Sequence, residues 1–429
     1  MKKVLVISYA FPPIGGGGVQ RSAKFVKYLR KFNWNPVVLT VANPSVPTVD
    51  EALFLEIPKD LTIYKAFTLE PSYAHKKKFT PSTIPAKGNL KQSIKKIITN
   101  LMLPDIQILW WPGLALKLIQ VLRKEKPNCI FVTAPPFSSF VPVVFIGNIF
   151  KIPVVLDFRD EWAYCRDQME NLSQSLYAIK IDRYFEKYCV SNSVGFTAAS
   201  ESYVEDISHR YNLINKKNGL CITNGFDEDD FKDHRLSNHK YDEVINVVFS
   251  GTVWKGTSLK NFIFVLEKII SNNKILRKLI KIKIFGRIVD SELEYFQSDT
   301  IRESIEIHGY IDHKHLVKEI MAADILLMAI TDSPGANKII LGKTFEYMAT
   351  GKHIFALIPN GESKRLLHDD YGNVTIVDPG NIDGIYNALF LLIENIDSVR
   401  QQKAKDVSRF SRKLLSEKLA IFFDRVSAS

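Results

Sequence analysis

A glycine-rich segment near the start of the chain could bind a phosphate. The segment FPPIGGGGVQR, residues 11–21, follows an apolar run at 3–8 and leads into a helical pattern. Gly17 and Gly18 would let backbone N–H groups approach a phosphate, and the helix N-terminus favours negative charge, whereas Arg21 is assigned to an acceptor or an anionic membrane surface. A dinucleotide-binding motif would need glycine where Gln20 stands, so that interpretation is excluded. A plain flexible turn remains an equal alternative.

Catalytic side chains are predicted after the apolar run at 153–158. Asp157, Arg159 and Asp160 lie within LDFRDEW, at the carboxyl edge where open α/β sheets place their sites. Asp160 could act as a base or orient a hydroxyl, Arg159 could bind phosphate, and Asp157 completes the predicted catalytic set. The alternative is a structural Asp–Arg ion pair at the end of the strand.

The second half of the chain contains another strand followed by a glycine turn, SGTVWKGTS at 250–258. Gly251, Thr252 and Lys255 could hold a diphosphate there through backbone amides and the lysine charge. Arg287 follows the strand-like run IKIKIF at a second edge of the same kind. These four residues are therefore predicted to bind a diphosphate.

A loop and a helix at 333–352 supply further candidates for anion binding. Lys343, near the helix start, could neutralise a phosphate, and Glu346, one turn later, could accept ribose hydroxyls. The spacing between Gly335 and Gly342 excludes a Walker loop. No HExxH, paired CxxC, GxSxG or DxD-type signature occurs, so no metal site is predicted, and the histidines around His313 are interpreted as surface or packing residues.

The elements that would position these residues alternate between strands and helices. The runs at 3–8 and 36–41 flank a helical pattern at 20–31, a βαβ unit that implies a parallel sheet, and the alternation starts afresh at 245–251. A chain of 429 residues exceeds the roughly 250–300 residues of a single core. We predict an α/β protein with domains at 1–232 and 243–405, a polar linker within 227–243, and a C-terminal helical segment at 406–429.

The charge distribution favours an anionic partner for the first part of the chain. Residues 1–150 contain 20 lysines and arginines against 7 acidic residues. In GNLKQSIKKIITNLML, residues 88–103, the apolar side chains share one helical face, and Lys91, Lys95 and Lys96 lie largely off it. This pattern suits an acceptor-binding or membrane-surface helix, although a helix packed on its own domain is commoner. No motif supports nucleic-acid binding.

Cysteine usage and the N-terminus indicate the compartment. The four cysteines form no CxxC pair and have no histidine at zinc spacing, as expected of free thiols in a reducing cytoplasm. The first apolar run is short and ends at Pro12-Pro13, which favours a first strand over a secretory signal. We therefore expect a cytoplasmic protein that can associate peripherally with the inner face of a membrane.

The order of the motifs resembles that of family-4-like (GT4) GT-B glycosyltransferases over nearly the whole chain except 44–112. The pieces that carry the resemblance are FPPIGGGGVQR, LDFRDEW, RYFEKYCVSNSVGFTAAS, CITNGFDEDDF, VVFSGTVWKG, HGYIDHKHLVKEIMAADILLMAI, GKTFEYMATGKHIFALIP and VDPGN. The resemblance implies a GT-B fold, in which two Rossmann-like domains face each other across a cleft. It implies that the first domain binds the acceptor, the second binds the donor, and the last helix crosses back to the first.

The resemblance also implies roles for particular residues. Glu346 matches the second glutamate of the family's E-x7-E motif, which contacts the nucleotide ribose, whereas Lys338 stands at the place of the first. The family's phosphate-binding arginine falls near Thr252, with Lys255 as its lysine partner. Because threonine stands in place of that arginine, the positive charge could instead come from Lys338, Lys343 or Arg287.

The expected activity is metal-independent transfer of a hexosyl or related sugar, with retention. The donor is a nucleoside-diphosphate sugar, which serves as a co-substrate, and no cofactor is expected. The acceptor is a saccharide or lipid-linked saccharide in surface polysaccharide or glycan biosynthesis. Two alternatives remain, namely a nucleotide-sugar epimerase on the same fold and a catalytically inactive GT-B scaffold or partner subunit.

Overall fold

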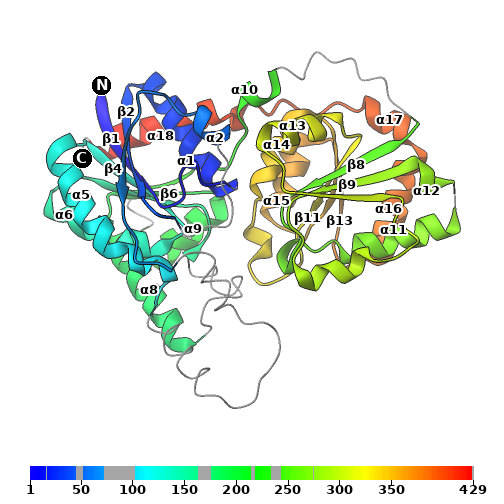
Figure 1. Ribbon diagram of the computed structural model, residues 1–429, viewed down its shortest axis with the longest axis horizontal. Helices are drawn as coiled ribbons and strands as arrows, with labels where there is room; N and C mark the ends of the chain where they lie inside the picture. The colour runs from blue at the N-terminus through cyan, green and yellow to red at the C-terminus, as the bar shows by residue number, and fades with distance from the viewer. Residues whose placement is uncertain are drawn as a thin grey trace. The chain divides into compact units, whose positions relative to one another are not determined.

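The computed structural model describes the chain except residues 16, 45–51, 72–101, 163–174, 214–217, 233–242, 274 and 428–429. The chain divides into two compact units (Figure 1). The N-terminal unit comprises Met1–Thr223 together with Arg412–Ser429, and the C-terminal unit comprises Asn224–Ser411. Each unit is built on one parallel sheet.

The N-terminal unit contains a seven-stranded sheet in the order β3-β2-β1-β4-β5-β6-β7. Every pair of neighbouring strands in it is parallel. The strand order changes direction between β1 and β4, which makes this the switch point of the sheet. The strands are β1 (Lys2–Ser8), β2 (Trp34–Val41), β3 (Thr62–Ala66), β4 (Cys129–Ala134), β5 (Val154–Phe158), β6 (Gly195–Ala198) and β7 (Gly219–Cys221).

Helices cover both faces of this sheet, because alternate residues of the strands are buried on opposite sides. Leu5 and Ile7 of β1 pack with one helical layer, and Val4 and Val6 pack with the other. The first layer contains α5 (Trp111–Glu125), α6 (Phe140–Ile149), α8 (Leu176–Ser191) and α9 (Glu201–Arg210). The second contains α1 (Gly17–Leu29) and α18 (Arg412–Ser427), which pack on each other.

The C-terminal unit contains a six-stranded parallel sheet in the order β10-β9-β8-β11-β12-β13. Its switch point lies between β8 and β11. The strands are β8 (Ile245–Ser250), β9 (Ile280–Phe285), β10 (Ile305–Gly309), β11 (Ile325–Ala329), β12 (His353–Leu357) and β13 (Val374–Val377). The helices of this unit are α10 (Glu228–Phe231), α11 (Lys260–Asn272), α12 (Leu276–Leu279), α13 (His313–Ala322), α14 (Gly342–Thr350), α15 (Glu362–Arg365), α16 (Ile382–Glu394) and α17 (Ile396–Gln401).

The division between the units lies at Thr223, nine residues before the predicted end of the first domain at 232. Phe226 and Phe231 explain the difference, since both are buried in the core of the C-terminal unit. The acidic residues around Phe231 look like a linker in the sequence, but they form the short helix α10 with Asp227 as its N-cap. At the other end, Phe226 pairs with Ser411, so the second unit extends six residues past the predicted boundary at 405.

Strongly apolar strands begin and end close to the predicted residues, and the α/β class is confirmed. The first helix begins earlier than predicted, because Gly17 and Gly18 form its first turn instead of the loop before it. The final helix begins only at Arg412, after residues 402–407, which have no regular secondary structure, and the short 3-10 turn η9 (Ser408–Phe410). Among the described residues, no helix is both long and apolar enough to cross a membrane.

Candidate functional site

The switch point of the C-terminal unit brings two glycine turns together. Gly251 follows β8 with φ +118°, Gly286 follows β9 with φ +128°, and the Gly251 amide donates to Phe285 O at 2.8 Å. A Cβ atom on Gly286 would lie only 2.2 Å from Gly251 O. Both positions therefore need glycine, because of the positive φ and, at Gly286, because of the close backbone approach.

Lys343 lies at this point, in the first turn of α14. Its Nζ donates a hydrogen bond to Ser250 O at 2.7 Å and stands 3.6 Å from the centre of the Phe249 ring. Burial lowers the pKa of this amine to about 7. The helix N-terminus adds partial positive charge at the same place, so Gly251 and Lys343 form a compact candidate site for an anion.

The loops that follow β8 and β9 are joined by their backbones. The Val253 amide donates to Arg287 O at 2.8 Å, and the Val289 amide donates back to Val253 O at 3.1 Å. Thr252 O accepts a hydrogen bond from Thr257 Oγ1 at 2.6 Å, which shapes the turn before Lys255. Lys255 and Arg287 are exposed, and neither side chain has an ion pair with another described residue. The structure thus places both cations on one continuous edge with their charges available.

Lys338 belongs to the loop between β11 and α14. It ends the short helical turn η7 (Ala336–Lys338), whose N-cap Gly335 has φ +83°. Two contacts fix this loop on the start of α15, since Ser363 Oγ donates to Ile339 O at 2.6 Å and the backbone of Asn337 abuts Gly361. Lys338 is half-buried in this well-held loop.

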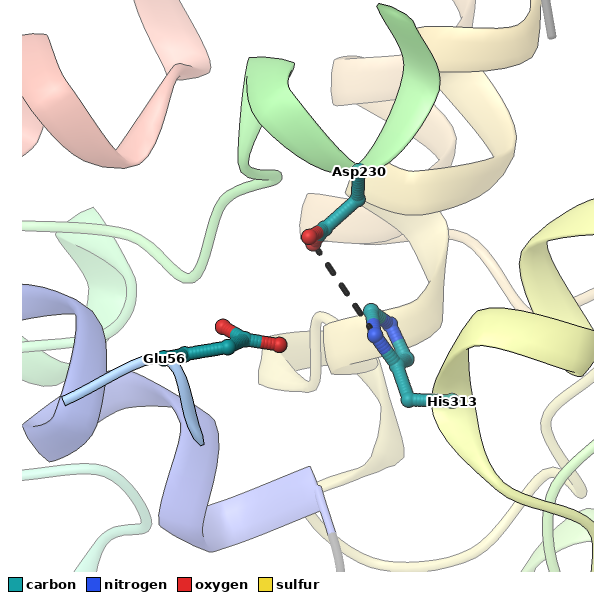
Figure 2. A group of neighbouring side chains, drawn as sticks. All are labelled: Glu56, Asp230 and His313. Carbon is teal, nitrogen blue, oxygen red and sulfur yellow. Dashed lines mark ion pairs between the residues drawn. The ribbon is translucent and has the colours of Figure 1, made fainter. Parts of the chain in front are cut away.

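Glu346 contacts His313, which lies at the start of α13. His313 Nε2 lies 3.0 Å from Glu346 Oε1, and His313 Nδ1 lies 3.9 Å from Asp230 Oδ2. Figure 2 shows the imidazole directed toward the Asp230 carboxylate. His313 therefore links the predicted ribose-binding glutamate to α10, a connection that the sequence analysis missed. His313 and Glu346 are 33 residues apart in the sequence, and no motif there indicates that their side chains meet.

In the N-terminal unit, Asp157 and Arg21 bind each other. Arg21 Nε and Nη2 donate to the two Asp157 oxygens at 3.0 and 2.7 Å, and Arg21 Nη1 donates to Thr223 O. Thr133 and Thr197 complete the shell by donating to the same carboxylate at 2.8 and 2.6 Å. Arg21 is 1% exposed and Asp157 0%.

The environment of this pair does not suit the predicted roles in catalysis and acceptor binding. Burial opposes ionisation of Asp157, but the Arg21 charge and the hydrogen bonds from Thr197 and Thr133 outweigh it and lower the carboxyl pKa. A carboxylate held in this way has neither solvent access nor spare acceptor capacity for a substrate. Asp157 therefore forms a structural ion pair at the end of the strand, which was the alternative to a catalytic role. Its partner is Arg21 and not the neighbouring Arg159.

Arg159 connects three loops at the switch point of the N-terminal unit. Its Nε and Nη2 donate to Ala134 O at 3.1 Å and Pro135 O at 2.5 Å, and its Nη1 donates to Gly18 O. A Cβ on Gly18 would lie 2.6 Å from Nη1, so the guanidinium occupies the space that a larger residue would need. Arg159 therefore holds the glycine turn in place, whereas Asp160 beside it is exposed.

The predicted site residues thus fall into separate groups. Gly251, Thr252, Lys255, Arg287 and Lys343 come together on one edge of the C-terminal sheet. Gly17 and Gly18 form the start of α1, with Arg159 and Asp160 at the same edge of the N-terminal sheet. Lys91, Lys95 and Lys96 lie outside the described residues.

Comparison with known proteins identifies the fold. Neither a protein-family model nor a curated protein sequence matches the chain. The structure of Anabaena Alr3699/HepE in complex with UDP-glucose is similar to this chain, with a TM-score of 0.58 and 12% sequence identity. The match covers 100% of this chain and 99% of the HepE chain. The lipopolysaccharide outer core galactosyltransferase WaaB is similar too, with a TM-score of 0.58 and 13% sequence identity. The match covers 99% of this chain and 100% of the WaaB chain.

A protein of Listeria monocytogenes proposed to be a UDP-N-acetylglucosamine 2-epimerase also matches, with a TM-score of 0.56, 10% identity, and coverage of 98% and 95%. Together with the two parallel Rossmann-like sheets, these similarities show that the chain has the GT-B fold. The fold is shared by a named transferase and a proposed epimerase, so the choice of activity depends on the site.

Proposed function

We propose that this protein transfers a sugar from a nucleoside-diphosphate sugar to a saccharide or lipid-linked acceptor, as a GT4-type glycosyltransferase. The observation that carries the proposal is the position of Lys343, whose amine lies at the N-terminus of α14 beside Gly251 at the C-terminal switch point. A diphosphate placed there would meet backbone amides, a helix N-terminus and a lysine. Exposed Lys255 and Arg287 on the same edge add charge for the second phosphate.

The proposed reaction breaks the bond between the anomeric carbon and the β-phosphate oxygen and forms one to an acceptor hydroxyl. Negative charge then builds up on the departing nucleoside diphosphate, and cations already in place stabilise it without rearrangement. Lys343 is suited to this role, because a partly desolvated amine takes up a proton when the phosphate arrives. The acceptor hydroxyl passes its proton to the departing β-phosphate oxygen as the new bond forms. Retention through front-face transfer, a hexosyl donor and the absence of a catalytic metal remain parts of the proposal.

Glu346 and His313 complete the proposed donor site. A carboxylate that accepts the ribose hydroxyls must be held in one rotamer, and the contact with His313 Nε2 does this. Lys338 stands where the resembled family has its first glutamate, so we assign it to the phosphates and not to the sugar hydroxyls. Recognition of the donor sugar must then differ from that of relatives that retain both glutamates.

In the N-terminal unit, we assign Asp160 as the residue that meets the acceptor. It is the exposed carboxylate of the LDFRDEW motif, whereas Asp157 is buried against Arg21. Arg159 acts as a positioning residue for the turn that contains Gly17 and Gly18. Lys91, Lys95 and Lys96 stay assigned to an acceptor or an anionic membrane surface, on the sequence pattern alone. A cytoplasmic location with peripheral membrane association, in surface polysaccharide or glycan assembly, fits this assignment.

A nucleotide screen tests the proposal. Thermal unfolding would be followed with UDP, GDP, dTDP, ADP and CMP, for the wild type and for Lys343→Ala and Glu346→Ala. Lys318→Ala, at an exposed lysine of α13, serves as the matched control. We expect one diphosphate to raise the unfolding temperature of the wild type and the control, and to raise it less in the two site variants.

The same screen separates the alternatives. If no nucleotide stabilises the wild type, the protein is an inactive GT-B scaffold or partner subunit. An epimerase would also bind the diphosphate, but it would change the configuration of the donor sugar without an acceptor present. Chromatography of the donor after incubation with the protein alone detects that product, and its appearance would contradict glycosyl transfer.

A further inference from the structure

Helices α5, α6 and α8 form a continuous layer on one face of the N-terminal sheet. Helix α5 packs on α6, and α6 packs on α8 (Figure 1). Their inner sides bury Leu114, Leu118, Phe140, Val143 and Cys189 in the core. The outer side of the layer is an exposed surface that the proposed donor site does not use.

Large apolar side chains are exposed on this outer side. Phe145 and Ile149 of α6 are 57% and 61% exposed, and Leu116 of α5 is 60% exposed. On α8, Tyr184 is 70% exposed, and Leu176 and Tyr177 at the start of the helix are exposed as well. Single exposed apolar residues are ordinary, but a group of six on adjoining helices is typical of a surface that binds something.

The charges on the same surface have one sign. Lys180, Arg183 and Lys187 recur at helical spacing on α8 and share the exposed face with Tyr184. The two acidic residues of this helix, Asp182 and Glu186, are buried on its inner side. Neighbouring exposed cations are Arg123 and Lys124 of α5 and Lys151 after α6.

No described residue of α5, α6 or α8 places an exposed carboxylate on this surface. The remaining acidic residue of these three helices, Glu125, is mostly buried and accepts hydrogen bonds from Lys3 Nζ and Tyr64 Oη. The fourth helix of the layer, α9, carries the exposed residues Glu201 and Glu205 and does not belong to this surface. Apolar side chains, tyrosines and cations without acids are the composition of a helix that rests on an anionic bilayer. Protein interfaces are instead depleted in lysine at their centre.

We propose that the outer face of α5, α6 and α8 docks the protein on a membrane that contains anionic phospholipid. Phe145, Ile149 and Leu116 enter the boundary between headgroups and acyl chains, and the tyrosines lie at headgroup level. The lysines and Arg183 attract the lipid phosphates. This surface is independent of the donor site, since it lies in the other unit, and it differs from the Lys91, Lys95 and Lys96 segment.

Vesicle co-sedimentation of the full chain tests the proposal. Vesicles of phosphatidylcholine with phosphatidylglycerol would be compared with vesicles of phosphatidylcholine alone, for the wild type and for Lys180→Gln/Lys187→Gln/Ile149→Ala. The matched control, Lys413→Gln/Lys418→Gln/Ile421→Ala, makes the same three changes on α18, on the opposite face of the same sheet. Ile421 and Ile149 are 63% and 61% exposed, so the two variants lose similar apolar area and equal charge.

We expect the wild type and the control to bind the anionic vesicles, and the α8/α6 variant to bind about thirtyfold more weakly, because each lysine near an anionic surface contributes on the order of 1 kcal/mol. Binding should weaken as salt is raised. If both variants lose binding equally, net charge alone is responsible and the proposal fails. It also fails if the wild type stays in the supernatant with both vesicles, as expected of a face that binds a protein.

Stabilisation of each variant by the nucleoside diphosphate provides the folding control. Both variants keep all the residues of the proposed donor site, so both should keep the wild-type stabilisation. Loss of vesicle binding with that stabilisation intact supports a membrane surface. Absence of nucleotide binding in all three proteins would contradict the proposed function while leaving the vesicle result valid.

Discussion

In the N-terminal unit the charged groups at the switch point are bound to the protein itself, whereas in the C-terminal unit several remain available. Arg21 is engaged by Asp157 and Thr223 O, and Arg159 by three backbone carbonyls. Across the C-terminal edge, Lys343 is bonded to one carbonyl, and Lys255 and Arg287 are exposed without ion pairs among the described residues. Equivalent places in two similar sheets therefore serve different purposes: one stabilises loops and the other can receive an anion.

The largest expected effect comes from breaking the buried pair of the N-terminal unit. Asp157→Ala leaves the Arg21 guanidinium buried without its partner, so we expect the free energy of unfolding to fall by about 3–5 kcal/mol. Urea denaturation followed by circular dichroism measures this. Lys343→Met, at the C-terminal edge, should change that free energy by less than about 1 kcal/mol.

The double variant Arg21→Met/Asp157→Leu provides the control for that prediction. It removes both charges, so it should be more stable than Asp157→Ala alone. A single variant as stable as the wild type would mean that Arg21 and Asp157 are not a structural pair, and the contrast between the two edges would then disappear.

The second effect concerns the glycine turns of the C-terminal edge. In Gly286→Ala, the new Cβ would lie 2.2 Å from Gly251 O at a φ of +128°, so we expect a loss of about 3 kcal/mol. In Gly309→Ala, the φ is +68° and no atom lies within 4 Å of the new Cβ, so a loss of about 1 kcal/mol is expected. Denaturation midpoints measure both, and equal losses would show that the close backbone approach does not exist in solution.

The third effect is the pH dependence of nucleotide binding at the C-terminal edge. Without ligand, the Lys343 amine loses its proton near pH 7, and a bound diphosphate favours the charged form. Binding above this pH must then take up a proton, so affinity should fall as pH rises, by at most about tenfold per unit. Below pH 7 Lys343 is already charged and contributes no dependence.

Calorimetric titrations with the diphosphate measure this slope. The range of about pH 6 to 9 brackets the Lys343 pKa of about 7. Lys343→Arg is charged throughout the range and should flatten it. A slope that persists in the arginine variant would assign the proton to another group.

The smallest expected effect concerns His313. His313→Ala frees Glu346 to adopt other rotamers and should weaken diphosphate binding about fivefold, the value of one lost hydrogen bond. His313→Gln, which can still donate to the carboxylate, should recover part of the loss. Titration calorimetry compares both with His315→Ala, a change at an exposed residue of the same helix. An effect of equal size in His315→Ala would contradict the positioning role.

The strands could be predicted wherever they are buried on both faces. The runs at 3–8 and 245–251 are mainly apolar, and the structure places β1 and β8 there. Strands β3 and β7 were not predicted, because β3 is mixed in polarity and only partly buried and β7 has three residues, all half-buried. Helix α10 was interpreted as linker because its acidic residues conceal the buried Phe231.

The site could be predicted only as far as strand ends reveal it. The sequence places Asp157 and Arg159 at the same edge, but it does not show that Arg21, 136 residues away, occupies the Asp157 carboxylate. His313 and Glu346 are likewise joined only by the packing of α13 on α14. Glycine turns and a lysine at a helix start are local features, and for this reason the Gly251 and Lys343 region could be identified from the sequence.

One calorimetric experiment tests whether the C-terminal edge binds the phosphate from which the sugar departs. The nucleoside diphosphate and monophosphate of the base selected by the screen would be titrated into the wild type, Lys343→Met and the control Lys318→Met. We expect the wild type and the control to bind the diphosphate more tightly than the monophosphate, and Lys343→Met to lose that difference. If the diphosphate has no advantage in the wild type, or keeps it in Lys343→Met, Lys343 does not bind the β-phosphate and the proposed donor site is wrong.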